Sequence, residues 1–188
     1  MNIGRNDIDW RNLSHDEIDR IIAERIEADD RRIEASGGKK PKRVGYILER
    51  IAEINNLREA DREAQDGKVK KNRFIRRHNL HPEEDLRALQ LMILTLDFPA
   101  PDYSVMKVRS DAGKVRDIVK QKYFPWRILH HAIMRVIGED IYKSLIYDTS
   151  ACIKGKGLHF GVRRMKSFLR RYPEYKWFVK TDFKKFYQ

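Results

Sequence analysis

The chain has 188 residues, enough for one ordinary domain or one and a half, and its single cysteine, Cys152, excludes disulfide scaffolds and cysteine zinc clusters. The net charge of +12 is unevenly spread: residues 1–36 hold 6 basic and 10 acidic residues, and the remaining 34 basic and 18 acidic residues give a net charge of +16. There is neither an apolar stretch of about 20 residues, as a membrane span requires, nor the apolar core of a signal peptide, so we expect a cytoplasmic protein without a membrane partner.

The first predicted element is a helix near the N-terminus. Ser14 and Glu17 have the spacing of a capping box, and isoleucines follow at helical intervals. The helix should end near Ala35, and a basic linker over 37–43 follows it.

Two further helices are predicted before the middle of the chain. The second helix frays near 65–67, and its apolar face consists of Ile47, Ile51, Ile54 and Leu57. The third begins at Pro82 and has an apolar stripe that ends at Leu96. His78 and His81 lie beside this proline, and we expect both on the surface because no cysteine or acidic cluster accompanies them.

The second half of the chain begins with a predicted β-hairpin. Its strands are expected at 103–109 and 114–120, and the turn at 110–113. Next come a helix that Pro125 opens, a loop, a helix over 158–171 and a strand over 177–182. The predicted class is therefore α+β and largely helical.

The hairpin concentrates positive charge. Alternation places Lys107 and Arg109 on one face of the first strand, and Arg116 and Lys120 on one face of the second, while Lys114 opens that second strand. Such a hairpin can fold over a triphosphate, which needs several cationic groups. A solvated strand edge protected by lysines is the simpler alternative.

The loop before the 158–171 helix contains two lysines and two glycines, Lys154, Gly155, Lys156 and Gly157. Glycines allow a backbone to approach a phosphate or a base closely, and the lysines supply charge. The spacing is not that of a nucleotide-binding P-loop, and a basic turn before a helix is an equally good interpretation.

A carboxylate follows the last apolar run. Trp177, Phe178 and Val179 lead to Asp182, and a buried strand that ends in an acid is a common support for a catalytic metal ion. Polymerases use two divalent ions with hard oxygen ligands. The alternative role for Asp182 is the N-cap of a helix.

Taken in order, four segments resemble the N-terminal part of a reverse transcriptase of bacterial or phage retroelements, of the diversity-generating or group II intron-like kind. The segments are INNLREADREAQDGK, YSVMKVRSDAGKVRDIVKQKYFPWRILHHAIMRVI, SACIKGKGLHFGVRRM and KTDFKKFYQ. Residues 1–43, an acidic helical extension with a basic linker, lie outside the resemblance. The resemblance implies a helical fingers region with a β-hairpin over 44–176. It implies the first strand of a truncated palm of the right-hand polymerase fold over 177–188.

The resemblance also implies a catalytic role for one acid. Asp182, with the carbonyl of Phe183, would ligate Mg²⁺, of which the complete enzyme holds two ions. Tyr187 would be the steric gate against a ribose 2′-hydroxyl. Losing the other metal ligands would remove most of the charge stabilisation in the transition state, and no Y-x-D-D sequence occurs in the chain, so the fragment is expected to be inactive alone.

The implied substrate contacts come from the two basic segments. Arg116 would bind the triphosphate of the incoming dNTP, with Arg109 or Lys107 as its partner and Lys114 nearby. The loop over 154–157 would touch the template strand.

The expected function is therefore that of an N-terminal fragment of an RNA-directed DNA polymerase. Its partners would be an RNA template, a DNA primer, a dNTP and the missing palm and thumb polypeptide. One alternative is a non-catalytic module that binds RNA or an RNA–DNA duplex through its basic body. Another is a structural protein whose acidic first helix docks on the basic body.

Overall fold

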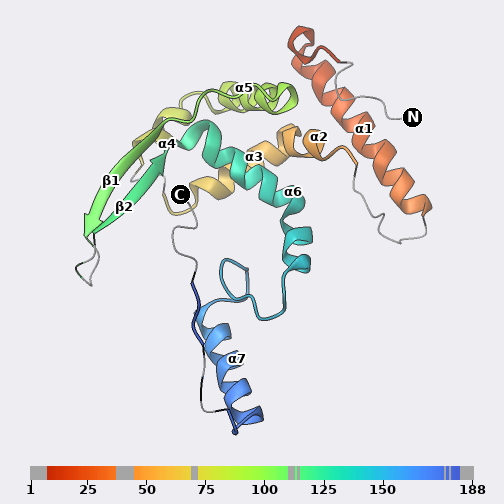
Figure 1. Cartoon of the computed structure of the whole chain (residues 1–188). Helices are drawn as coiled ribbons and strands as arrows, with labels where there is room; N and C mark the ends of the chain where they lie inside the picture. The colour runs from red at the N-terminus through yellow and green to blue at the C-terminus, as the bar shows by residue number, and fades with distance from the viewer. Residues whose placement is uncertain are drawn as a thin grey trace. The chain divides into compact units, whose positions relative to one another are not determined.

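The computed structural model describes residues 8–36, 45–68, 72–109, 113, 115–175, 177 and 179–182. The chain divides into two units, Met1–Glu139 and Asp140–Gln188, and each is described by itself. Within the described residues the fold is α+β and mostly helical, with one two-stranded antiparallel sheet, which confirms the predicted class (Figure 1). In the described ranges, every helix is too short or too polar to span a lipid bilayer.

Short and long helices alternate from η1 to α5, and a β-hairpin separates them from η2, α6 and α7. In chain order they are η1 (Trp10–Asn12), α1 (His15–Ala35), α2 (Ile47–Ala52), α3 (Ile54–Gln65), α4 (Arg73–His78), α5 (Pro82–Thr95), β1 (Tyr103–Arg109), β2 (Val115–Gln121), η2 (Tyr123–Arg127), α6 (Ile128–Ser144) and α7 (Leu158–Arg171). The hairpin lies within one residue of its predicted strands, and α7 has its predicted bounds. The helix expected to begin at Pro125 instead starts as the π-helical turn η2 and becomes α-helical at Ile128.

The start of α1 confirms the predicted capping box. The Ser14 hydroxyl accepts a hydrogen bond from the Glu17 amide at 3.3 Å, and the Glu17 carboxylate accepts one from the Ser14 amide at 2.9 Å. Two amides that the helix itself leaves without partners are thereby satisfied.

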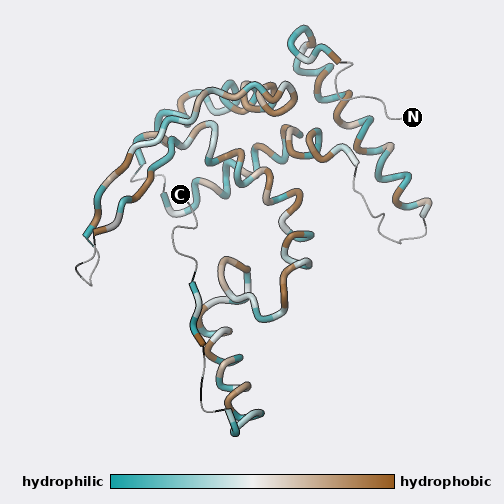
Figure 2. The backbone as a smooth tube through the Cα atoms, viewed as in Figure 1, coloured by the Kyte–Doolittle hydropathy of each residue, from teal (hydrophilic) through white to brown (hydrophobic). Residues whose placement is uncertain are grey.

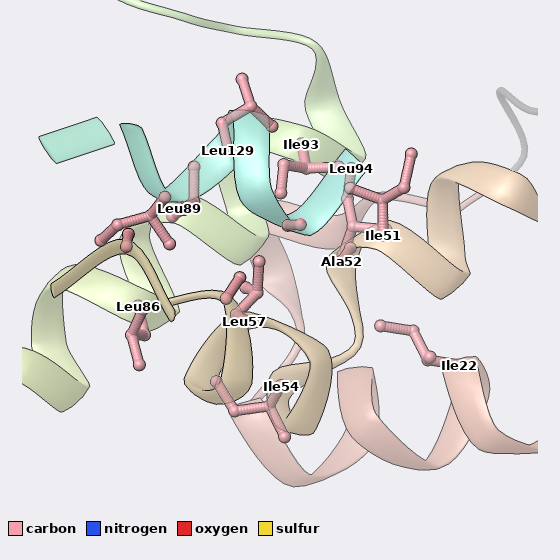
Figure 3. Close-up of a cluster of buried hydrophobic side chains, with 14 of the residues drawn as sticks. Ile22, Ile51, Ala52, Ile54, Leu57, Leu86, Leu89, Ile93, Leu94 and Leu129 are labelled. Atoms are coloured by element: carbon pink, nitrogen blue, oxygen red, sulfur yellow. The ribbon is translucent and has the colours of Figure 1, made fainter. Parts of the chain in front are cut away.

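The core of the first unit collects the apolar faces of its helices. Figure 3 shows Ile22 of α1, Ile51 of α2, Leu57 of α3 and Leu89 of α5 in one cluster, with Leu129 of α6 beside them. Each comes from a helix whose apolar residues recur every three or four positions and so face one side. Leu96 is not part of this core: it is the exposed C-cap of α5, in the left-handed conformation.

The predicted second helix is in fact two helices, because Glu53 has a non-helical backbone conformation and separates α2 from α3. Side chains from elsewhere satisfy the carbonyls that the break leaves free. Asn56 donates to the carbonyl of Ile51 at 3.1 Å, and Gln90 of α5 donates to that of Ala52 at 3.0 Å. The break is therefore stabilised by tertiary contacts and has no local glycine or proline signal.

Helix α1 is fixed to the rest of the unit by ion pairs as well as by its isoleucines. The buried Asp29 carboxylate accepts from the Gly45 amide at 3.1 Å and lies 3.3 Å from the Arg50 guanidinium. Nearer the start of α1, both oxygens of Asp19 lie 2.8 Å from the Arg87 guanidinium. A Cβ on Gly45 would lie 2.8 Å from the Asp29 carboxylate, so this approach requires glycine.

A buried polar network centred on His78 joins α3, α4, α5 and η2. His78 is 3% exposed, which corrects the expectation of a surface residue; His81 does lie on the surface. The His78 Nδ1 is 2.6 Å from Asp85, and Nε2 is 3.2 Å from Asp61 without the angle of a hydrogen bond. The Tyr123 hydroxyl donates to the same Asp61 carboxylate at 2.5 Å. The partners of His78 come from three other elements of the chain. Its burial therefore could not be predicted from the residues next to it in the sequence.

Candidate nucleic-acid interface

The hairpin presents its predicted cations in two rows. The register pairs Lys107 with Asp117 and Ser104 with Lys120, so Lys107 and Lys120 lie on opposite faces of the sheet. The Lys120 ammonium is 3.2 Å from the sulfur of Met106, and both residues lie on the same face of the sheet.

The first-strand cations do not share a register position with Arg116. The backbone of Arg116 pairs with that of Val108, while Lys107 and Arg109 pair with the residues on either side. Lys114 lies outside the described residues. Lys107 and Arg109 therefore share one row, as predicted, but the backbone position of Arg116 belongs to the other row, so the register does not pair Arg116 with either of them.

The glycine-containing turn has the backbone geometry that only glycine adopts easily. Gly155 has a φ of +80° and Gly157 a φ of +146°, and a Cβ at either residue would meet no atom within 4 Å. The glycines are thus required by backbone angle, while the space beside them is open. Lys154 is exposed on this turn.

Lys156, expected to touch a template, is held within the second unit. Its ammonium donates to the Tyr147 carbonyl at 2.6 Å and lies 4.8 Å from the Tyr147 ring centre and 5.0 Å from that of Phe160. Arg164 of α7 also stacks over the Tyr147 ring and forms an ion pair with Asp148. These cation–π contacts fasten the loop to α7, so the described conformation gives Lys156 a structural role.

The segment that leads to Asp182 does not form the predicted buried strand in its described residues, 177 and 179–182. Trp177 is 92% exposed and Val179 88% exposed, and Asp182 itself is exposed. A strand needs a hydrogen-bonding neighbour, and the described part of the second unit contains no other strand. Phe183 and Tyr187 lie outside the described residues.

The described residues do not make a magnesium site. Among them, no group of three or more acidic, histidine or cysteine side chains comes together, and Asp182 stands alone as a candidate ligand. A two-metal centre needs several carboxylate oxygens around each ion. The described residues therefore support no metal-dependent step.

Helix α7 carries a basic face that the sequence interpretation overlooked. An open hollow of about 530 Å³ is lined by Arg163, Lys166, Ser167, Arg170 and Arg171. The signal was present in the sequence, because cations at intervals of three and four residues share one side of a helix.

The functional residues thus belong to separate units. The hairpin lies in Met1–Glu139, and the glycine turn, α7 and Asp182 lie in Asp140–Gln188. Searches of protein-family models and of curated proteins found no match to the chain.

Proposed function

We propose that the chain is the fingers region of an RNA-directed DNA polymerase, a reverse transcriptase of the bacterial or phage retroelement kind. In this role it binds an RNA template, a DNA primer and a dNTP. The observation that carries the proposal is the order of four segments: a helix, a basic hairpin with the helix after it, a glycine-containing turn, and the segment around Asp182. Each segment is a weak signal, and their order is what supports the family.

The local geometry supports contact with a nucleic acid at two places. The hairpin has exposed strands on which Lys107 and Arg109 occupy one row, suitable for phosphate oxygens. The turn at Gly155 and Gly157 leaves open space beside its backbone, where a base or sugar can approach.

Binding, and not synthesis, is the activity expected of these 188 residues alone. Asp182 is one carboxylate, and phosphoryl transfer through two metals needs more. The chain should bind a short RNA–DNA hybrid with an affinity that falls steeply as salt increases, because phosphate contacts release counterions. It should not extend the primer when Mg²⁺ and dNTPs are added.

Fluorescence anisotropy and a primer-extension assay on the same hybrid test both expectations. Lack of binding at low salt would remove the support for a nucleic-acid role. Robust extension of the primer would contradict the expectation that Asp182 alone cannot support two-metal catalysis.

A second candidate function is a non-catalytic module for RNA or an RNA–DNA duplex, and the basic face of α7 favours it. Cross-linking with a photoreactive dNTP in the presence of hybrid separates the two. A polymerase fingers region should be labelled within 103–121, and Lys107→Gln/Arg109→Gln should reduce that labelling. A binding module should bind the hybrid equally well and give no specific label.

A further inference from the structure

The basic face of α7 is built from one helix without an acidic residue. Arg163, Lys166 and Arg170 follow at intervals of three and four, and they line the hollow together with Ser167 and Arg171. Like charges at such intervals destabilise a helix by a few tenths of a kcal/mol per pair. The dipole of the helix favours Arg170 and Arg171 near its C-terminus, but this does not account for Arg163 and Lys166.

The cations of this face lack acidic partners within the described part of the chain. Arg163, Lys166, Arg170 and Arg171 form no ion pair with a described carboxylate, whereas Arg164 of the same helix pairs with Asp148. Arg164 is also covered by the rings of Tyr147 and Phe168, at 5.0 and 4.8 Å from their centres. The same helix thus separates a neutralised structural arginine from a row of cations available to an anionic ligand.

Two aromatic rings follow the end of the helix, and the first of them contacts Arg171, one of the residues that line the hollow. The rings of Tyr172 and Tyr175 are 5.8 Å apart, and the Arg171 guanidinium lies 5.6 Å from the Tyr172 ring centre. Tyr175 is 68% exposed, so one side of its ring is open to a ligand. Cations that follow a phosphate backbone, next to rings on which bases stack, are the combination used to bind single strands.

We propose that α7 and the two tyrosines bind a single-stranded nucleic acid, with phosphates along Arg163, Lys166 and Arg170 and a base on Tyr175. A duplex keeps its base faces stacked inside, so the open ring favours a single strand. That the ligand is a nucleic acid rests on the proposed function. The location of the site on α7 and the preference for a single strand are new.

An alternative occupant is an anionic lipid surface, because α7 alternates polar and apolar positions along its length (Figure 2) and exposes Leu158, Met165 and Leu169. Two features favour a nucleic acid: the cations line a hollow with a serine hydroxyl, and the exposed tyrosines follow directly. Vesicle binding is therefore an outcome of the test.

The experiment measures binding of the full chain to a labelled, unstructured oligouridylate at several salt concentrations. Lys166→Gln/Arg170→Gln keeps good helix formers and should make the slope of log K against log salt less negative by about 1.4, for two lost phosphate contacts. Arg20→Gln/Arg31→Gln removes the same charge from exposed positions on α1 and should leave the slope unchanged.

The stacking part is tested with Tyr175→Ala, which should weaken oligouridylate binding roughly ten-fold, while Tyr175→Phe retains the affinity. Circular dichroism checks that helix content is kept in every variant. Equal affinities of the α7 variant and the wild type for oligouridylate overturn the inference, as does binding to phosphatidylserine vesicles without binding to the oligonucleotide.

The two proposals fail in different ways. If the photoreactive dNTP does not label the hairpin but the α7 variants lose oligouridylate, the polymerase assignment fails and the single-strand site stands. If the hairpin is labelled and the α7 variants bind normally, only the single-strand site fails.

Discussion

His78 shows how one residue can make the stability of the first unit depend on pH. Burial acts to lower the pKa of His78, but its contacts with Asp61 and Asp85 outweigh burial and raise the pKa above the ordinary value of 6.5. Burial likewise acts to raise the pKa of Asp61, yet the contacts with His78, Tyr123 and Gln65 lower it. The charged histidine and the charged aspartate are therefore the forms that the fold favours.

The sign of the pH dependence follows from the raised pKa of His78. Its stabilising contribution is complete below the unfolded value of 6.5 and is lost as the pH rises through the higher pKa of the folded state. We expect the free energy of unfolding, measured by urea denaturation, to fall from mildly acidic to mildly alkaline pH. His78→Gln should remove this fall and, by leaving Asp61 without its cationic partner, cost about 3 kcal/mol at acidic pH.

His131 provides the control for that measurement. Burial and the nearby Arg127 lower its pKa, so its own contribution to stability has the opposite sign and diminishes at acidic pH. The alkaline fall should therefore persist in His131→Gln. A wild-type stability that stays constant across this pH range would refute the role given to His78.

At the scale of elements, the sequence predicts what local chemistry determines. The capping box at Ser14 and Glu17 uses residues only three positions apart, so the start of α1 was predicted correctly. The break at Glu53 was not predicted, because its stabilising partner Gln90 lies 38 residues from Ala52. The apolar spacing simply continues through the break.

The candidate site was predictable to a similar extent. Alternation along the strand correctly placed Lys107 and Arg109 in one row. The structural role of Lys156 depends on its contacts with the rings of Tyr147 and Phe160, and no local sequence pattern predicts those contacts. For Asp182, an apolar run predicted a strand that forms only with a hydrogen-bonding neighbour. Sequence periodicity thus gives positions along an element and not the contacts between elements.

Asn56 offers a test of the break between α2 and α3. Its amide donates to the carbonyls of Ile51 and Ala132, at 3.1 and 3.3 Å, and its oxygen accepts from Arg135 at 3.0 Å. Asn56→Ala should lower the free energy of unfolding by about 2 kcal/mol, because carbonyls in a partly buried site lose their donor. The neighbouring Asn55 is exposed, and Asn55→Ala should change stability by less than about 0.5 kcal/mol in the same denaturation experiment. Equal losses in the two variants would contradict this account of the break.

At the scale of the whole molecule, the two units differ in how much they bury. The first unit holds the entire core of buried apolar side chains, whereas no described residue of Asp140–Gln188 is buried. Burial of apolar surface is the main stabilising term in folding. The second unit should therefore open more readily than the first.

Native-state hydrogen exchange followed by mass spectrometry measures that difference. Amides of α7 should exchange far faster than those of α3 and α5, whose buried residues tie them to the core. Saturating oligouridylate should slow exchange in α7 specifically, since a ligand that binds only the folded helix stabilises it. Protection of α7 equal to that of α5 without ligand would show that the second unit has stabilising contacts beyond those described.

The attachment of α1 has a practical consequence for cloning. Its Ile18 and Ile22 complete the same core as Ile51, and its carboxylates neutralise Arg50 and Arg87. A polypeptide that starts at residue 45 would expose the apolar side chains that α1 covers and would leave Arg50 without its carboxylate partners, whereas Arg87 would keep Glu83. We expect it to aggregate and to bind polyanions without specificity. Tighter RNA retention after such trimming would report a damaged protein and not the release of an inhibitory segment.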